Sequence, residues 1–544
     1  MMITRYQVTP LTPSRFVPTP ATMPSENSPI PATARNEPRL VRALGPWIAI
    51  AVVVGNVIGS GIFLKPGAIA DAAGDFRVIL AMWITGGALC ILGGLCFAEL
   101  AAMFPQAGGL YVYLREAYGK PVAFLCGWNI VLFGTPASCA ALAVAFIGSF
   151  ANAIGWHPSL FAEIGMAAMM IGSMALVNIL GVVWGGRLQM MFTLVKAGFL
   201  GLVALTPFVL LPVLETSVDW TNYGSRIEPH QPSLAGQIGT VLLAVMWAYN
   251  GWHGVTPLAE EVREPQRNIP FALLGGIGIL ITLYLAANLA YHGVLSMEEM
   301  RAAGDHVAER MVGKLLGPSG AAAISVVIMC STFGAINTNL LTVPRTSFAM
   351  GRDRVFFSAL GRVHEKFHTP AAAIAVMAGM AILLIVCAGV GKHWVSGAQA
   401  TPANSSSAAD NSERMESGPD VAKSTAKSRN ENLWARILDS LRNDSLFALF
   451  TNFVIFSASI FYALGVAAVV VLRIRRPDLA RPYRTFAYPW VPLAFLLVYI
   501  WFLGQIYLTK PLESRMGLVI IALGVPVYWM YRKLQSPTPK HADT

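Results

Sequence analysis

Long apolar stretches separated by short polar segments run through most of the 544-residue chain. A helix needs about 20 residues to cross the hydrocarbon core of a bilayer. The pattern therefore predicts an all-α integral membrane protein with twelve membrane-spanning helices. The predicted spans cover residues 46–73, 76–103, 123–150, 158–181, 188–213, 236–260, 271–295, 318–346, 371–390, 447–472, 487–508 and 514–532.

Glycines interrupt the first span. Gly55, Gly59 and Gly61 stand close together, and each costs a helix roughly 1 kcal/mol relative to alanine. In lipid, every amide and carbonyl freed by a break needs a partner, so a break is tolerated where it faces a cavity or a ligand. Unwinding here would start a second half-helix at Ser60, Gly61 and Ile62, whose amides favour a carboxylate. The alternative is that the glycines only let neighbouring helices pack closely.

The sixth span contains a second interruption. Residues 247–255 bring Asn250, Gly251, His253 and Gly254 to mid-membrane depth. Because the two interrupted spans are five apart, the sequence predicts two inverted repeats of five helices. The repeats cover about residues 46–213 and 236–472, and two further helices follow at about 487–532.

Polar segments flank and divide the predicted membrane domain, residues 44–534. Residues 1–43 are rich in Pro, Thr and Ser and are predicted to form a disordered cytoplasmic tail. Residues 535–544 form a second cytoplasmic tail. A Ser-, Ala- and Asn-rich insert at 391–443 falls outside the membrane when the spans are counted, and its sequence indicates no function.

Lysine and arginine are concentrated on one side of the predicted membrane. With the N-terminus inside, the cytoplasmic segments collect most of them, for example Arg115, Arg345 and Arg473, and the short outside loops carry few. This bias predicts that both termini are cytoplasmic and that the protein lies in a plasma (inner) membrane. The net charge of +10 is therefore an orientation signal and does not indicate nucleic-acid binding. Composition agrees, since 55% of residues are hydrophobic and only 12% are charged.

No pattern for covalent or metal chemistry is visible. The cysteines lie within or at the edge of the apolar spans and form no CxxC or Cys/His cluster, which argues against a disulfide framework or a metal site. No nucleophile–base pair indicates an enzyme, and no motif indicates a cofactor. The six cysteines are Cys90, Cys96, Cys126, Cys139, Cys330 and Cys387.

Three groups of residues together resemble a known family. They are Gly59–Phe63 in span one, the segment from Ala98 to Tyr111 with Phe104-Pro105 and Gly108-Gly109, and the segment from Tyr249 to Pro270 with Glu260-Glu261. In this order and spacing they are similar to the amino acid–polyamine–organocation (APC) superfamily, most closely to its L-type amino acid transporter branch. The resemblance extends from Pro46 to about Arg532.

The resemblance implies a LeuT-like fold with a substrate site at the two breaks. The α-carboxylate of an amino acid would meet Ser60, Gly61 and Ile62, and its α-ammonium would meet backbone carbonyls at the ends of the broken halves. The family places a gating aromatic at Trp247; the alternative is a packed aromatic. His253 either faces the substrate or packs as a neutral side chain. The implied substrate-binding residues are Val57, Ile58, Gly59, Ser60, Gly61, Ile62, Trp247, Ala248, Asn250 and Gly251.

Lys196 lies inside the fifth span, where a lysine costs about 2.5–3.5 kcal/mol on insertion scales and is expected to have partners. In the L-type branch, a matching lysine occupies the place of Na⁺ in sodium-coupled relatives. Lys196 would then be a fixed cation or a titrating group for proton coupling, and the alternative is a lysine that reaches the membrane interface. The implied partners are Gly55 and Asn56 in span one and Ser331, Thr332 or Asn337 in span eight.

The sequence thus predicts a sodium-independent secondary transporter that moves amino acids by alternating access, as an exchanger or a proton-coupled carrier. A polyamine or organic-cation carrier is one alternative, but spans one and six offer no acidic residue at mid-depth. A sensor that binds an amino acid without moving it is another. Relatives that pair with a heavy chain use a cysteine in the loop after span three. That loop has none here, so we expect no disulfide-linked partner, and a homo-oligomer stays open.

Overall fold

The computed structural model describes residues 40, 42–209, 218–229, 233–397 and 446–535. Within these residues the chain is helical, and the only β-type pairings are two isolated bridges, Leu44–Val262 and Asp75–Arg226. The predicted tails and the predicted insert lie largely outside the described residues. Of the insert, residues 391–397 are described and continue the preceding helix.

The prediction of twelve spans is confirmed. In the described part of the chain, eleven helices or broken helices are long and apolar enough to cross a membrane, and one shorter apolar helix, α11, ends at the second interruption. In chain order the spans are α1 with α2 (Pro46–Val57, Gly61–Leu64), α4 (Phe76–Met103), α6 with α7 (Lys120–Asn129, Thr135–Ile154), α8 (Leu160–Leu180), α9 (Val182–Val209), α11 (Leu234–Ala248), α12 (Pro265–Val294), α14 (Val307–Thr342), α16 (Ala371–Gly397), α19 (Leu446–Arg475), α20 (Trp490–Thr509) and α21 (Pro511–Gln535).

Spans that hold the same place in the two repeats pack against each other. α4 packs along α12, α7 along α14 and α8 along α16, and the members of each pair are five spans apart. α7, α8, α14 and α16 share one apolar core, whereas α1, α4, α11 and α12 contribute to a larger core with α19 and α20. This pairing is what inverted repeats produce, and it confirms the LeuT-like five-plus-five architecture.

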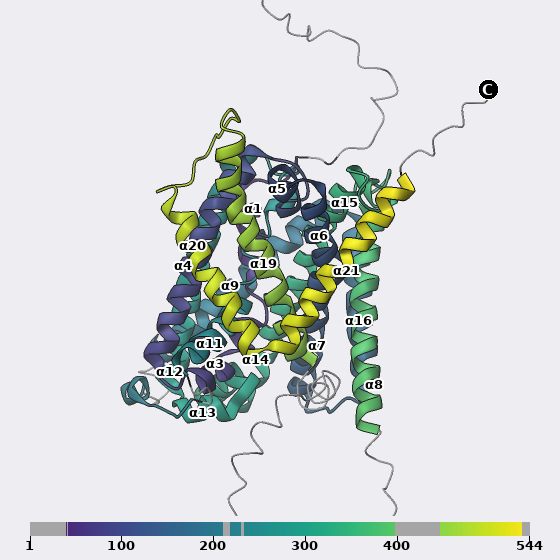
Figure 1. The fold of residues 1–544 in the computed structure, drawn as a ribbon. Coiled ribbons are helices and arrows are strands. Elements are labelled where there is room, and N and C mark those ends of the chain that lie inside the picture. The colour runs from purple at the N-terminus through teal and green to yellow at the C-terminus, as the bar shows by residue number, and fades with distance from the viewer. Residues whose placement is uncertain (1–39, 41, 210–217, 230–232, 398–445, 536–544) are drawn as a thin grey trace, which may run out of the picture. The chain divides into compact units, whose positions relative to one another are not determined.

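Four short helices lie at the two ends of the bundle. Figure 1 shows α5 (Leu110–Tyr118) and α15 (Pro344–Arg352) at one end, and α3 (Pro66–Ala73) and α13 (Met297–Ala303) at the other. We call these the α5/α15 end and the α3/α13 end. At the latter, Gly317 (φ 70°, ψ −166°) kinks α14 and separates its first turns from its membrane-spanning part.

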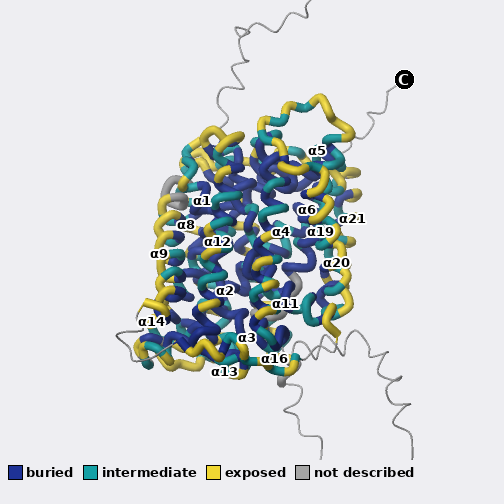
Figure 2. The backbone as a smooth tube through the Cα atoms, turned by 90° about the vertical axis from the view of Figure 1, so that its left-hand side faces the viewer, coloured by how far each residue is buried: buried dark blue, intermediate teal, exposed yellow. Residues whose placement is uncertain are grey.

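Exposed apolar side chains cover the outer helices. Figure 2 shows yellow, exposed turns along α9, α20 and α21, whereas the helices between them are mostly dark blue. Leu202, Leu497 and Met530 are each more than half exposed. A surface this apolar suits lipid and not water.

Candidate functional site

The first span unwinds between α1 and α2. The amide of Ile58 still donates to the Val54 carbonyl of α1 (2.9 Å), and the next helical bonds run from the Phe63 and Leu64 amides to the Ser60 carbonyl (3.1 and 2.9 Å). The amides at 60–62 therefore belong to the first turn of a new helix, where no intrahelical carbonyl can reach them. The Ser60 hydroxyl is buried and finds no hydrogen-bond partner among the described residues.

The second break follows α11 and is tied to the first. Gly251 has a φ of 93°, which glycine adopts without strain. Its carbonyl accepts a 2.9 Å hydrogen bond from the Asn56 side-chain amide. A Cβ atom at Gly251 or Gly254 would collide with that amide, so both glycines make room for Asn56.

Tyr284 of α12 joins the ends of α1 and α11. Its hydroxyl lies 3.1 Å from the Val57 carbonyl and 3.0 Å from the Ala248 carbonyl, and it can donate to one of them at a time. A Cβ atom built on Gly61 would lie 2.5 Å from the Cα of Ala248. The two breaks thus touch through backbone, and bulk at Gly61 would separate them.

A cavity of about 40 Å³ lies between the breaks. A second cavity of about 70 Å³ shares part of its lining and reaches toward α6, α7 and α19. At roughly 10–15 Å³ for each water-sized probe, both have room for several polar atoms. Trp247 lines the smaller cavity and is 7% exposed. Among the described residues, neither cavity is lined by an Asp, Glu, Lys or Arg. The smaller one is lined by Asn56, Val57, Gly59, Ser60, Gly61, Ser138, Leu142, Trp247, Asn250, Gly251, Ala335 and Asn339.

Lys196 is fully buried against the first break. Its ammonium donates to the Ile58 carbonyl (2.8 Å) and to the Gly55 carbonyl. The Ser331 hydroxyl of α14 shares the Ile58 carbonyl (3.0 Å) and also lies 3.2 Å from the Gly59 carbonyl. Lys196 and Ser331 together hold the carbonyl end of α1 from the α9 and α14 sides.

Three residues that the sequence suggested as partners of Lys196 make other side-chain contacts. Thr332 donates to the carbonyls of Ile328 and Met329 in its own helix (2.9 and 3.1 Å). Asn337 Nδ2 donates to Gln189 (3.2 Å) and its Oδ1 accepts from Asn178 (2.8 Å), so Asn337 stands in the middle of a buried polar row that links α8, α14 and α9. The Asn56 amide is engaged by Gly251, as described above.

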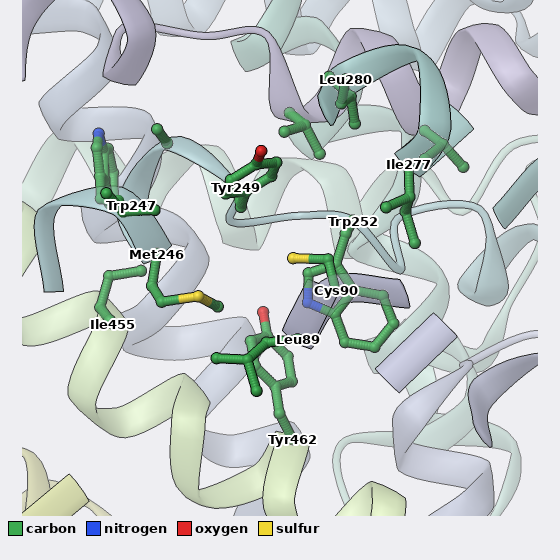
Figure 3. Packing of buried hydrophobic residues seen from close by; sticks show 14 of the residues in the cluster. Leu89, Cys90, Met246, Trp247, Tyr249, Trp252, Ile277, Leu280, Ile455 and Tyr462 are labelled. Carbon is green, nitrogen blue, oxygen red and sulfur yellow. The ribbon is translucent and has the colours of Figure 1, made fainter. Parts of the chain in front are cut away.

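Aromatic side chains from four helices surround the second break. Figure 3 shows Trp247, Tyr249 and Trp252 of the sixth span among residues of α4, α12 and α19, with Tyr462 of α19 below them. His253 lies next in the chain and packs against Phe97, with ring centroids 5.7 Å apart. Its Nε2 lies 2.9 Å from the Tyr462 hydroxyl.

Several of these contacts could not be read from the sequence. Tyr284 and Tyr462 are ordinary aromatic residues in apolar helices, and no spacing connects them with the breaks. A π-helical turn at Ile130–Gly134, which joins α6 to α7 and lines the larger cavity, also carries no sequence signal. The sequence motifs predicted the glycine breaks, and the cost of burying a lysine in a membrane span singled out Lys196. The residues that contact the breaks come from distant parts of the chain.

Comparison with known proteins identifies the class to which this arrangement belongs. Residues 44–525 match the amino acid permease family. The serine/threonine exchanger SteT of Bacillus subtilis is 30% identical over 498 residues, which cover 91% of this chain and 98% of SteT. The human large neutral amino acids transporter small subunit 2 is 28% identical, covering 93% of this chain and 83% of the relative. The mouse Asc-type amino acid transporter 1 is 27% identical, with coverage of 90% and 81%.

The chain belongs to the amino acid permease family. It is a multi-pass membrane transporter of amino acids, and the predicted membership in the APC superfamily is confirmed. The prediction that it is no enzyme is confirmed by the same relatives, which are transporters by name.

Proposed function

We propose that this transporter is a sodium-independent exchanger and that its substrate spans the two breaks. The α-carboxylate lies at the amides of Ser60, Gly61 and Ile62, with the Ser60 hydroxyl as a further donor. Three features support this placement: amides in a first helical turn, a buried hydroxyl without a partner among the described residues, and an adjoining cavity. The positive end of a helix dipole favours an anion at this point.

The α-ammonium lies near the carbonyl ends of α1 and α11. The Tyr284 hydroxyl donates to the carbonyl of Val57 or to that of Ala248, and the Ile58 carbonyl accepts from both Lys196 and Ser331. A carbonyl has two lone pairs, so the Val57 and Ala248 carbonyls can still take a second donor, whereas both lone pairs of the Ile58 carbonyl are used. Trp247 lines the same cavity and would cover the bound amino acid as its gate.

We infer sodium independence from the position of the Lys196 ammonium. It is fully buried on two carbonyls of the first break, beside the Ser331 hydroxyl. Carbonyl and hydroxyl oxygens of this kind are ligands that hard cations use. A covalently attached ammonium occupies that environment permanently, so substrate binding needs no soluble cation.

We also propose an orientation in the membrane and the absence of a disulfide-linked partner chain. The α5/α15 end, which carries Arg115, Arg345 and Arg352, faces the cytoplasm, and both termini lie on that side of the inner membrane. The loop between α7 and α8 contains no cysteine. We therefore propose a transporter that works without a disulfide-linked partner chain.

Uptake of labelled amino acids into proteoliposomes tests this function. It is measured with and without internal amino acid, with and without Na⁺, and with an inward proton gradient. We expect uptake that requires internal amino acid and does not depend on Na⁺. Uptake that depends on Na⁺ would contradict the role of Lys196. Absence of uptake for every amino acid, in protein shown to be folded, would contradict transport itself.

A further inference from the structure

A chain of three polar side chains fixes the orientation of Asn250 at the second break. The Tyr462 hydroxyl donates to Asn250 Oδ1 at 2.9 Å, and His253 Nε2 lies 2.9 Å from the same hydroxyl. A hydroxyl has one proton, and here it goes to Asn250. His253 Nε2 must therefore carry the proton of the second bond and donate it to Tyr462. Tyr462 is 7% exposed, so its hydroxyl is shielded from bulk water.

This orientation leaves the Asn250 Nδ2 group for another partner. The amide oxygen of Asn250 is occupied by Tyr462, and in the described part of the chain Nδ2 donates to no protein group. Asn250 lines both cavities and is partly exposed to them. A fixed donor with two N–H bonds thus stands where the two cavities meet.

The larger cavity also supplies an acceptor and a further donor. Asn129 lines it and is 1% exposed, and its Oδ1 is buried without a hydrogen-bond partner among the described residues. The Ser138 hydroxyl accepts from Asn339 Nδ2 at 3.4 Å, which leaves its own proton to donate. Buried polar groups without partners are costly, so a ligand that pairs with them is favoured over one that does not.

We propose that Asn250 recognises the substrate's side chain and that Tyr462 and His253 are positioning residues that hold its amide. The inference rests on the proposed function, because it assumes that an amino acid occupies the smaller cavity. A side chain reaching the larger cavity then meets Asn250 as a donor and Asn129 as an acceptor. The chemical class that satisfies both is small and uncharged, with a hydroxyl or a carboxamide.

Two classes of side chain are disfavoured by the same lining. A cationic side chain would face the Asn250 donor with no carboxylate among the described residues that line either cavity. An apolar side chain of equal size would leave Asn250 Nδ2 and Asn129 Oδ1 unpaired. Sites that hydrogen-bond a substrate group reject analogues that lack it for this reason.

Threonine and valine provide the test, since they have nearly the same shape and differ by one hydroxyl. The two amino acids compete in proteoliposome exchange, and the ratio of their kcat/KM values is measured. The wild type is expected to prefer threonine by about tenfold or more. Equal use of threonine and valine would overturn this inference and leave the proposed function standing. No exchange of any amino acid would overturn both.

Variants separate recognition from structure. Tyr462→Phe releases the Asn250 amide and should lower the threonine-to-valine ratio of kcat/KM by about 3- to 10-fold, mainly through a higher KM for threonine. Asn250→Ala should do the same, whereas Asn250→Asp should admit lysine. His253→Gln keeps a donor and should retain the preference that His253→Leu loses. Equal losses for threonine and valine in Asn250→Ala would overturn the assignment, because the amide would then serve the common part of every substrate.

Tyr118→Phe is the matched control. The Tyr118 hydroxyl also bonds to α19, at the Leu464 carbonyl (3.0 Å), but Tyr118 does not line either cavity. This variant removes a tyrosine hydroxyl of α5 that bonds to α19, and it should keep the threonine preference. A loss of preference in Tyr118→Phe as large as in Tyr462→Phe would overturn the positioning role of Tyr462.

Discussion

Replacing Lys196 by methionine keeps the length of the side chain and removes its charge. Two hydrogen bonds from the ammonium disappear, and the Gly55 and Ile58 carbonyls lose a donor. A hydrogen bond to a charged group contributes about 1.5–3 kcal/mol. The removed charge also no longer needs to be desolvated, which offsets several kcal/mol of the loss in folding stability. We therefore expect Lys196→Met to fold.

The effect on the substrate site is larger than the effect on folding. Lys196 holds the carbonyl end of α1, and the amides that we assign to the carboxylate follow within a few residues. If substrate binding must make up the free energy of even one lost hydrogen bond, affinity falls by about 1.5–3 kcal/mol, which is about 10- to 150-fold. Ser331→Ala should act in the same direction with a smaller loss, because Lys196 still holds the Ile58 carbonyl.

The assay is the concentration dependence of exchange in proteoliposomes that contain saturating internal amino acid. Thermal unfolding of the purified variants shows that they are folded. Thr332→Val is the matched control, since Thr332 is equally buried in α14 but donates only within its own helix. Wild-type affinity and rate in folded Lys196→Met would refute the role given to Lys196.

Further predictions address the breaks and the α3/α13 end. Gly61→Val should abolish amino acid binding, because a Cβ at this position meets the Cα of Ala248 at 2.5 Å. Gly59→Ala should still bind, since the nearest atom to a Cβ at Gly59 belongs to a flexible leucine side chain 3.4 Å away. Equilibrium binding of a labelled amino acid distinguishes the two variants. Tyr284→Phe should lower the free energy of unfolding by about 1–3 kcal/mol, measured by thermal unfolding, since two buried carbonyls lose their shared donor. The Glu309 carboxylate, hydrogen-bonded to His306 at 2.6 Å, raises the pKa of that histidine. The stabilisation from this pair is then fully present below the unfolded-state pKa of about 6.5 and is lost as pH rises through the higher folded-state pKa. His306 is about half exposed, so the stabilisation should stay below about 1 kcal/mol. We expect the unfolding midpoint of the wild type, but not that of Glu309→Gln, to fall as the pH rises above neutral. Identical pH profiles for the two proteins would contradict this prediction.

The features that could be predicted from the sequence are those with a strong cost in a membrane. A lipid-facing helix disfavours both glycine and lysine. The structure accordingly places Gly55, Gly59, Gly61 and Lys196 at the contacts of the first break. The five-span spacing of the breaks was enough to predict the repeats. These are local signals, so no knowledge of packing was needed.

The partners of these residues depend on packing and could not be predicted. Tyr284 reaches Val57 across 227 positions of the chain, and Tyr462 reaches Asn250 across 212. Their hydroxyls look like those of any tyrosine in an apolar helix. Thr332 and Ser331 were equally plausible neighbours of Lys196 by sequence. The rotation of α14 turns only Ser331 toward the break.

An experimental structure of the protein in lipid nanodiscs, prepared with amino acid in sodium-free buffer, would show where the substrate binds and what holds the first break without Na⁺. We expect an amino acid between the breaks, with its carboxylate at the amides of Ser60, Gly61 and Ile62. We also expect the Lys196 ammonium to remain on the carbonyls of Gly55 and Ile58. An amino acid bound elsewhere, or Lys196 turned away from the break while substrate is bound, would refute the proposed site.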